Sequence, residues 1–342
     1  MFRIAPLTAG FLGRAAGEFE SFTYPRLRPL LARAGQSTSA AGCIAVGVWM
    51  GEQPAGLALY SEPWALPPEG AAAASLPPGI DSADAADSAR SPEATPPKDR
   101  RRLLSVMVHP LARRSGLGMR LLASGEALAR ESGTRRLVAV HSSRMQARQA
   151  FERLLAVCGW RPPQELEFRL AGRAAWAERA KHDWAGFLQR LADRGFGTTS
   201  WRDMDDAEWA KARRVAHELP EADRAFDPFS RNIGVTPLAD LSIVLRREER
   251  IVGWIVGSRG ALADSFHYSQ GYALPEVRRL GWLAAGARDV CERQAKLHGA
   301  ASLSVFETSQ GNTAMRRFME RQLEPYSEWT DSRYVSEKEL QP

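Results

Sequence analysis

The residues with the clearest chemical potential lie at 106–122, in the stretch VMVHPLARRSGLGMRLL. A short apolar run leads into a proline, two arginines and two glycines, and a helix-like pattern follows. The N–H groups of a first helical turn have no partner within the helix, and the helix dipole adds partial positive charge. Gly116 and Gly118 let a ligand approach the backbone, and Arg113 and Arg114 can donate charge-assisted hydrogen bonds. We therefore expect this loop to bind a pyrophosphate.

Three phosphate-binding motifs could describe such a loop. A Walker loop needs Gly-Lys-Ser/Thr, which is absent, and a Rossmann fingerprint needs three glycines where two are present. The third motif is Arg/Gln-x-x-Gly-x-Gly/Ala at the head of a helix, and RRSGLG at 113–118 matches it. Because this pattern is short, an ordinary strand-to-helix connection remains the alternative, and the surrounding elements must decide.

Those elements predict strands and helices in a mixed order. Apolar alternation and turn residues indicate the strands, while apolar positions at helical spacing indicate the helices. In chain order we expect a hairpin at 43–50 and 55–60, a strand at 101–108, a helix at 119–133, a strand at 136–141 and a helix at 145–157.

The second half of the chain repeats this order. Gly56 and Gly253 are 197 positions apart, whereas Pro110 and Pro275 are 165 apart. The drop in offset matches the length of 67–99, a Pro-, Ala-, Ser- and Asp-rich segment that we expect to be a flexible insertion in the first copy only. The sequence thus predicts a tandem duplication. The expected elements of the second copy are a hairpin at 241–257, a strand, loop and helix at 267–299, a strand at 301–309 and a helix at 312–323.

The loop and the order of elements resemble motif A and the overall pattern of the GCN5-related N-acetyltransferases, and the resemblance covers nearly the whole of each half. In that family the loop cradles the pyrophosphate of acetyl-coenzyme A. The resemblance implies an α/β (α+β) fold of two tandem acetyltransferase-like domains, each a mixed central sheet flanked by helices. We expect an N-terminal domain at 1–172 with an intact loop, a linker helix at 173–195 and a C-terminal domain at 196–342 with a degenerate loop.

The resemblance also assigns roles to individual residues. Val108 would donate its backbone N–H to the developing oxyanion. His141 ends a strand and suits the role of base, with Glu62 as the next candidate. The alternatives are that His141 is a polar strand-end residue and Glu62 a surface residue, neither with a catalytic role. The tyrosine acid of the family is missing, because its position falls on Phe151 or Leu155. The residues expected to bind the acyl-CoA are Met107, Val108, Arg113, Arg114, Ser115, Gly116, Leu117, Gly118, Met119 and Ser143.

The loop of the second copy departs from the motif. PEVRRLGWL keeps Pro275, Arg278 and Gly281, but Leu283 stands where the second small residue belongs. A branched side chain there should obstruct the approach of a phosphate. We interpret this copy as degenerate, with an active second copy as the alternative.

The chain is therefore expected to be a CoA-dependent N-acyltransferase that transfers an acyl group, acetyl in the first instance, to the amine of a small molecule or peptide. The acyl-CoA is a co-substrate bound in the N-terminal domain. One alternative is a tandem transferase of the same fold whose donor is an aminoacyl-tRNA or a carrier protein. Another is a non-catalytic protein that binds CoA or a small molecule.

Composition limits the partners and the compartment. The 342 residues carry a net charge of +6, dispersed along the chain, so nucleic acid is not an expected partner. No run of 18 apolar residues suggests a membrane span, and no secretory signal is evident. Cys43, Cys158 and Cys291 are far apart without metal-ligand spacing, so we expect reduced thiols, no metal and a cytoplasmic location. The oligomeric state stays open.

Overall fold

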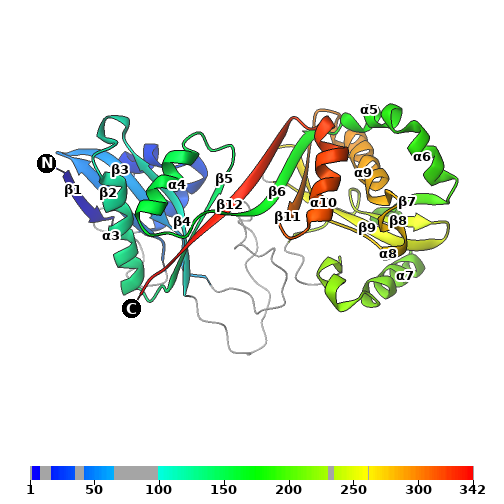
Figure 1. Ribbon diagram of the computed structural model, residues 1–342, viewed down its shortest axis with the longest axis horizontal. Coiled ribbons are helices and arrows are strands. Elements are labelled where there is room, and N and C mark those ends of the chain that lie inside the picture. Colours follow the sequence, from blue (N-terminus) through cyan, green and yellow to red (C-terminus); the bar gives the residue numbers. More distant parts are fainter. Residues whose placement is uncertain are drawn as a thin grey trace. The chain divides into compact units, whose positions relative to one another are not determined.

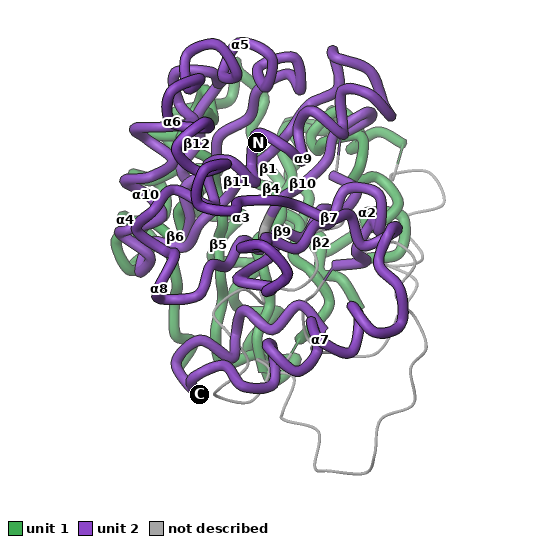
Figure 2. The backbone as a smooth tube through the Cα atoms, turned by 90° about the vertical axis from the view of Figure 1, so that its right-hand side faces the viewer, with its two compact units in different colours: residues 1–70, 75–166, 333–342 green, residues 71–74, 167–332 purple. Residues whose placement is uncertain are grey.

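The computed structural model describes residues 2–7, 17–34, 42–64, 99–229, 235–260 and 262–341 (Figure 1). Apart from Asp99, the expected insertion at 67–99 lies outside these residues. The chain divides into two compact units, which are coloured separately in Figure 2. Unit 1 contains the described residues up to Leu166 and those from Arg333 onward, and unit 2 spans Glu167–Ser332.

Unit 1 is a mixed sheet between two apolar layers, with strand order β1-β2-β3-β4-β5-β12. Helices α3 and α4 pack on one face, and the short helices before β2 pack on the other. Its elements are β1 (Phe2–Pro6), η1 (Glu20–Phe22), η2 (Pro25–Leu27), α2 (Arg28–Arg33), β2 (Ile44–Met50), β3 (Gln53–Tyr60), β4 (Arg100–Val108), η3 (Pro110–Ala112), α3 (Leu117–Glu131), β5 (Arg136–Ser142), α4 (Arg148–Val157) and β12 (Trp329–Glu339).

Unit 2 has the same plan, with strand order β6-β11-β10-β9-β8-β7 and an apolar layer on each face. The predicted hairpins, strands and helices are present in both units, so the expected α/β class, with mixed strands flanked by helices in each unit, is confirmed. Its elements are β6 (Gln164–Arg173), α5 (Trp176–Asp183), α6 (Ala185–Ala192), β7 (Phe196–Ser200), η4 (Trp201–Asp203), α7 (Asp206–His217), η5 (Glu221–Phe226), β8 (Ile243–Arg247), β9 (Arg250–Arg259), β10 (Ser265–Ala273), α8 (Pro275–Arg278), α9 (Trp282–His298), β11 (Leu303–Ser309), α10 (Thr313–Phe318), the π-helix η6 (Met319–Leu323) and η7 (Glu324–Tyr326).

In each unit two parallel strands part after four rungs. In unit 1 the ladder joins Arg100–Leu103 of β4 to Arg136–Ala139 of β5. In unit 2 it joins Ser265–Tyr268 of β10 to Leu303–Phe306 of β11. The later rungs of β4 pair with β3 alone among the described strands, through a register shift opposite Leu59. The carboxyl half of β4 therefore presents one backbone edge to the opening between the strands.

The last strand of each sheet comes from the other sequence copy. Strand β12 lies beside β5 (Figure 1) and pairs antiparallel with it. Tyr334 is the residue opposite His141. Strand β6, which follows α4 in the chain, pairs with β11 in the same way, and Arg169 lies opposite Glu307. Tyr334 and Arg169 differ by the same 165 positions as the two loops, so the copies have exchanged equivalent strands. The compact units thus differ from the continuous ranges 1–172 and 196–342 expected from the sequence.

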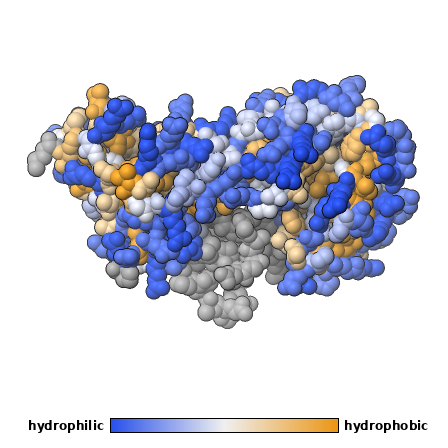
Figure 3. Space-filling model, in the orientation of Figure 1, coloured by the Kyte–Doolittle hydropathy of each residue, from blue (hydrophilic) through white to orange (hydrophobic). Residues whose placement is uncertain are grey.

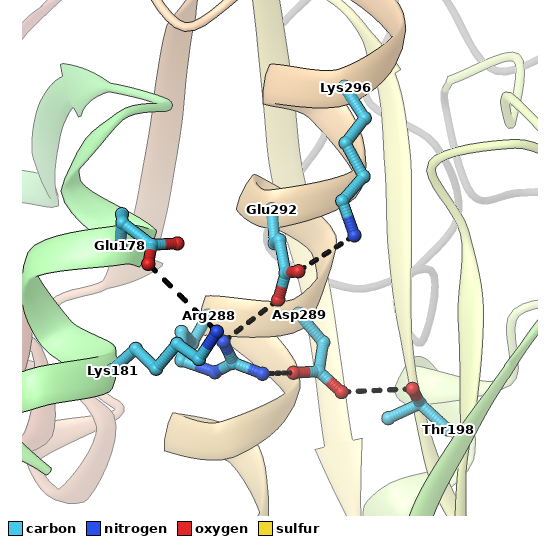
Figure 4. Close-up of polar contacts among 7 residues, drawn as sticks. All are labelled: Glu178, Lys181, Thr198, Arg288, Asp289, Glu292 and Lys296. Atoms are coloured by element: carbon cyan, nitrogen blue, oxygen red, sulfur yellow. Dashed lines mark hydrogen bonds and ion pairs between the residues drawn. The ribbon is translucent and has the colours of Figure 1, made fainter. Parts of the chain in front are cut away.

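In place of the single linker helix expected at 173–195, the chain forms two short helices, α5 and α6. Helix α9 of unit 2 carries a line of charged residues on one side (Figure 4). Asp289 accepts a hydrogen bond of 2.9 Å from Thr198 of β7 and pairs with Arg288, which also bonds Glu292. Burial raises the pKa of Asp289 above its ordinary value, against the effect of Arg288 and Thr198. These contacts hold α9 against the edge strand of its sheet.

No helix in the described ranges is both long and apolar enough to cross a membrane. The face drawn in Figure 3 is mainly hydrophilic, with apolar residues in separate patches on each unit.

Among the ion pairs that join β12 to the rest of unit 1, Lys338–Glu126 is largely buried and Arg161–Glu339 is exposed. Lys338 Nζ lies 2.5 Å from Glu126 Oε2 and 2.6 Å from the carbonyl oxygen of Cys158, while Trp160 Nε1 donates to Glu126 Oε1 at 3.0 Å. Arg161 Nη2 and Glu339 Oε1, 2.8 Å apart, are instead largely exposed.

Replacing Lys338 with Met should lower the free energy of unfolding by about 2–3 kcal/mol, because it leaves the buried Glu126 carboxylate without its cation. Arg161→Ala should change it by less than about 0.5 kcal/mol, as for an exposed pair. Urea unfolding of the two variants and the parent measures both values. Equal, small effects would contradict the placement of β12 in the sheet of unit 1.

Candidate active site

The carboxyl end of β4 directs one backbone N–H into the opening beside β5. Val108 is paired with Gly56, and the N–H of His109 donates to the carbonyl of Ala55 at 2.8 Å. In an antiparallel ladder, this places Val108 at a non-hydrogen-bonded position, so its own N–H and C=O point away from β3. The carbonyl accepts a hydrogen bond of 3.1 Å from Arg113 Nε. The Val108 N–H is thus directed toward the space that β5 has left.

The turn after β4 brings cations to the amino end of α3. Gly116 is the N-cap residue with φ of 77°, and no side chain caps the first turn. Arg114 also has a positive φ, 65°, which is uncommon for a residue with a side chain. The first turn contains no acidic residue, and Arg113 to Ser115 are exposed. Free N–H groups, a helix dipole and two arginines together form an anion site.

Gly118 lies in the first turn of α3, where that helix meets α4. A Cβ at this position would lie 3.3 Å from both methyl carbons of Leu154, which is a tight contact. Glycine therefore lets the two helices approach each other next to the anion site. Helix α4 begins at Arg148, with Ala147 as its N-cap residue. Ser142 therefore ends β5, Ser143 lies in the turn that follows, and neither caps the helix.

The residues expected to bind the donor come together at one edge of the sheet. The carboxyl ends of the parallel strands β4 and β5 meet there, beside the amino end of α3. Met107 and Val108 end β4, Arg113, Arg114, Ser115 and Gly116 form the turn, Leu117, Gly118 and Met119 begin α3, and Ser143 lies in the turn after β5.

Glu62 is not brought to this edge. It follows β3, and the N–H of Ser61 donates to the carbonyl of Arg102 near the start of β4. Six residues of extended strand, roughly 20 Å, separate that point from Val108. The side chain of Glu62 is exposed. This separation favours His141 over Glu62 as the base.

His141 is buried at the far end of β5, on the sheet face covered by α4. Its Nε2 lies 2.8 Å from Glu152 Oε1, and its ring contacts Phe151 edge-on and stacks on Tyr334 of β12. Arg148 Nε donates to the same Glu152 oxygen at 2.7 Å, and its guanidinium lies 4.2 Å from the centre of the Tyr334 ring. Burial opposes ionisation of Glu152, but the hydrogen bonds from Arg148 and His141 hold its pKa below the ordinary value.

Our sequence reasoning missed three members of this cluster. Arg148 and Glu152 are spaced i, i+4 on the predicted helix, which is a detectable ion-pair signal. Tyr334 is 165 positions beyond Arg169, so extending the repeat offset to the ends of the two copies would have matched their strands. No pattern in neighbouring residues predicts that β6 and β12 each pair with a strand of the other copy.

Unit 2 reproduces the turn geometry at the same offset of 165 positions. Arg278 Nε donates to the carbonyl of Ala273 at 3.2 Å, as Arg113 does to Val108. Gly281 is the N-cap residue of α9 with φ of 84°, which matches Gly116. The duplication thus extends to individual hydrogen bonds.

The equivalent anion site of unit 2 is filled from within. Phe187 of α6 lies so near Gly281 that a Cβ there would be 2.6 Å from its ring. Leu283, where unit 1 has Gly118, packs in the same apolar cluster. Arg278 is also engaged, because its Nη2 donates to Asp223 Oδ2 at 2.9 Å. Helix α6 thus covers the helix end that is open in unit 1.

Asp223 also accepts a hydrogen bond of 2.7 Å from the hydroxyl of Tyr272. Burial and the Asp223 carboxylate together raise the pKa of Tyr272 to about 12. Among the residues that the structure describes, no group of three or more His, Cys, Asp or Glu side chains could hold a metal ion.

Comparison with known proteins supports the resemblance. Residues 15–156 match the Acetyltransferase (GNAT) family. A tandem GNAT protein from the clavulanic acid biosynthesis pathway, solved without acetyl-CoA, aligns over 100% of this chain and 99% of its own, with 14% identity and a TM-score of 0.51. The GCN5-related glucosamine N-acetyltransferase region of a fungal multi-domain GH3 β-N-acetylglucosaminidase aligns over 98% of this chain and 38% of that chain, with 12% identity and a TM-score of 0.52. No curated protein sequence is significantly similar. At these identities the solved structures establish the fold.

The Tyr272–Asp223 hydrogen bond should make the stability of unit 2 depend on alkaline pH. The folded pKa of Tyr272 is above that of the unfolded chain, so its contribution is complete below about pH 10 and is lost as pH rises toward 12. Tyr272→Phe should therefore be less stable than the parent at pH 8, and the gap should narrow above pH 10. Calorimetric melting at both pH values tests this, and a gap independent of pH would contradict it.

Proposed function

Because residues 15–156 match the acetyltransferase (GNAT) family, we propose that the chain is a CoA-dependent N-acyltransferase whose donor binds in unit 1 alone. The observation that carries this proposal is the contrast between the two helix ends. The first turn of α3 is open and flanked by Arg113 and Arg114. The first turn of α9 is covered by Phe187.

The donor would place its pyrophosphate on the first turn of α3. The N–H groups of that turn and the two arginine side chains supply hydrogen bonds and positive charge. The rest of the donor would run from there toward the opening between β4 and β5. The Val108 N–H then lies where the thioester oxygen would develop negative charge.

Acyl transfer needs a neutral amine, so a base must take a proton as the amine attacks. His141 is the candidate at the same edge of the sheet, whereas Glu62 is distant. Helix α4 carries no tyrosine, so the CoA thiolate would depart without the acid that the family uses. The acceptor is the amine of a small molecule or peptide, acetyl is the acyl group we expect, and a cytoplasmic location fits these substrates.

Calorimetric titration of the full chain with acetyl-CoA tests the donor site. We expect one site per chain, with binding below detection in Gly118→Leu, because the new side chain would press on Leu154 and cover the first turn of α3. Gly118→Ala is the milder variant and should weaken binding measurably. Leu283→Gly is the matched control in unit 2 and should add no second site, because Phe187 still covers Gly281.

Other results of the titration would contradict this proposal. Two sites in the parent would show that unit 2 also binds the donor. No binding would move the proposal to a donor attached to tRNA or a carrier protein. One site without turnover of any amine would identify a binding protein. Melting temperatures of the variants separate lost affinity from lost folding.

A further inference from the structure

The imidazole of His141 has one engaged nitrogen and one unsatisfied nitrogen. Nε2 lies 2.8 Å from a carboxylate oxygen of Glu152, while Nδ1 is buried and has no hydrogen-bond partner among the residues that the structure describes. The whole residue is 6% exposed. Buried polar atoms in native proteins nearly always have partners, so an orphaned ring nitrogen calls for an explanation.

The partner of Nε2 determines which nitrogen carries the proton. An ionised carboxylate only accepts hydrogen bonds, so the neutral ring must place its proton on Nε2 to donate to Glu152. Nδ1 is then the nitrogen with the free lone pair. Arg148 donates to the same Glu152 oxygen and favours its ionised form.

The position of Nδ1 fits a base for an amine. The rungs between β4 and β5 stop at Ala139, two residues before His141, so the ring lies beside the opening in the sheet. Its side chain is on the same sheet face as those of Val106 and Val108. Tyr334 covers the ring from β12 and Phe151 from α4, which limits its rotation.

We propose that Glu152 is a positioning residue that holds His141 with Nδ1 as the proton acceptor, so that the unsatisfied nitrogen receives its partner from the N–H of the acceptor amine. This inference rests on the proposed function. As the amine nitrogen bonds to the thioester carbon, its proton passes to Nδ1. The C–S bond then breaks, CoA leaves as a thiolate, and the imidazolium proton is finally transferred to that sulfur or to solvent. The products are the amide and CoA.

The equivalent helix of unit 2 offers a matched control. Arg316 Nε donates to Glu320 Oε1 at 2.8 Å with the same i, i+4 spacing as Arg148 and Glu152. Glu320→Ala therefore removes a comparable i, i+4 ion pair in the other unit.

The first measurement is the NMR spectrum of the full chain with ¹⁵N-labelled histidine, with His141→Gln used to assign the signal. We expect a protonated Nε2 and a bare Nδ1 in the parent, with a hydrogen-bonded Nε2–H proton that is retained in Glu152→Gln and lost in Glu152→Ala. A parent ring protonated on Nδ1 would overturn the inference. An Nε2–H signal unchanged in Glu152→Ala would do the same.

The second measurement is thiol release from acetyl-CoA, with spermidine, glucosamine or a glycine peptide as acceptor and water as the basal acceptor. Glu152→Ala should lower kcat at least about tenfold, within the range of general-base effects, with the Kd of acetyl-CoA changed less than about twofold. Glu152→Gln should restore part of the loss, and Glu320→Ala should match the parent. Full kcat in Glu152→Ala would refute the inference. Failure of the parent to bind acetyl-CoA would instead refute the proposed function, while the NMR result still decides the positioning role.

Discussion

The short parallel ladder between β4 and β5 is the constraint on which the candidate site depends. Four rungs hold the strands together, and beyond Leu103 and Ala139 they part. If the ladder continued, the Val108 N–H would bond to a neighbouring strand and could not meet a ligand. Because it stops, the backbone of one strand and the His141 side chain of the other face a common opening. Strand β4 stays paired with β3 as far as Val108, so its other edge remains hydrogen-bonded along the opening.

Unit 2 keeps the same parting of strands and the same turn, yet its helix end is closed. The bond from Arg278 to the Ala273 carbonyl and the left-handed Gly281 show that unit 2 has the same turn geometry as unit 1. In unit 1 the helix end and its arginines are open to an anionic ligand. In unit 2 Phe187 covers the helix end, and Asp223 pairs with Arg278. The two copies thus show one backbone geometry with and without room for a ligand.

Much of this could be predicted from the sequence because the signals are local. Strand alternation, helical spacing and the turn RRSGLG each occupy a few consecutive residues, and the structure has the corresponding elements. The repeat offset identified Gly56 and Gly253, which both approach the neighbouring strand's backbone closely. The contacts of Phe187 with Gly281 and of Tyr334 with His141 join residues far apart in sequence, and neither residue type signals its partner. The Glu152–Arg148 ion pair can be predicted from its i, i+4 spacing, whereas the contact of Glu152 with His141 cannot.

The exchange of β6 and β12 also affects how the chain is made. The first copy is synthesised before the second, and its last strand, β6, pairs with β11 of the second copy. The sheet of unit 1 lacks strand β12 until Lys338 and its neighbours emerge, after the rest of the second copy. Domains generally fold in the order in which they are translated. In this protein the half that emerges first can be completed only after β12 has emerged, so a chain truncated before β12 would lack the strand that covers His141 and the cation that neutralises Glu126.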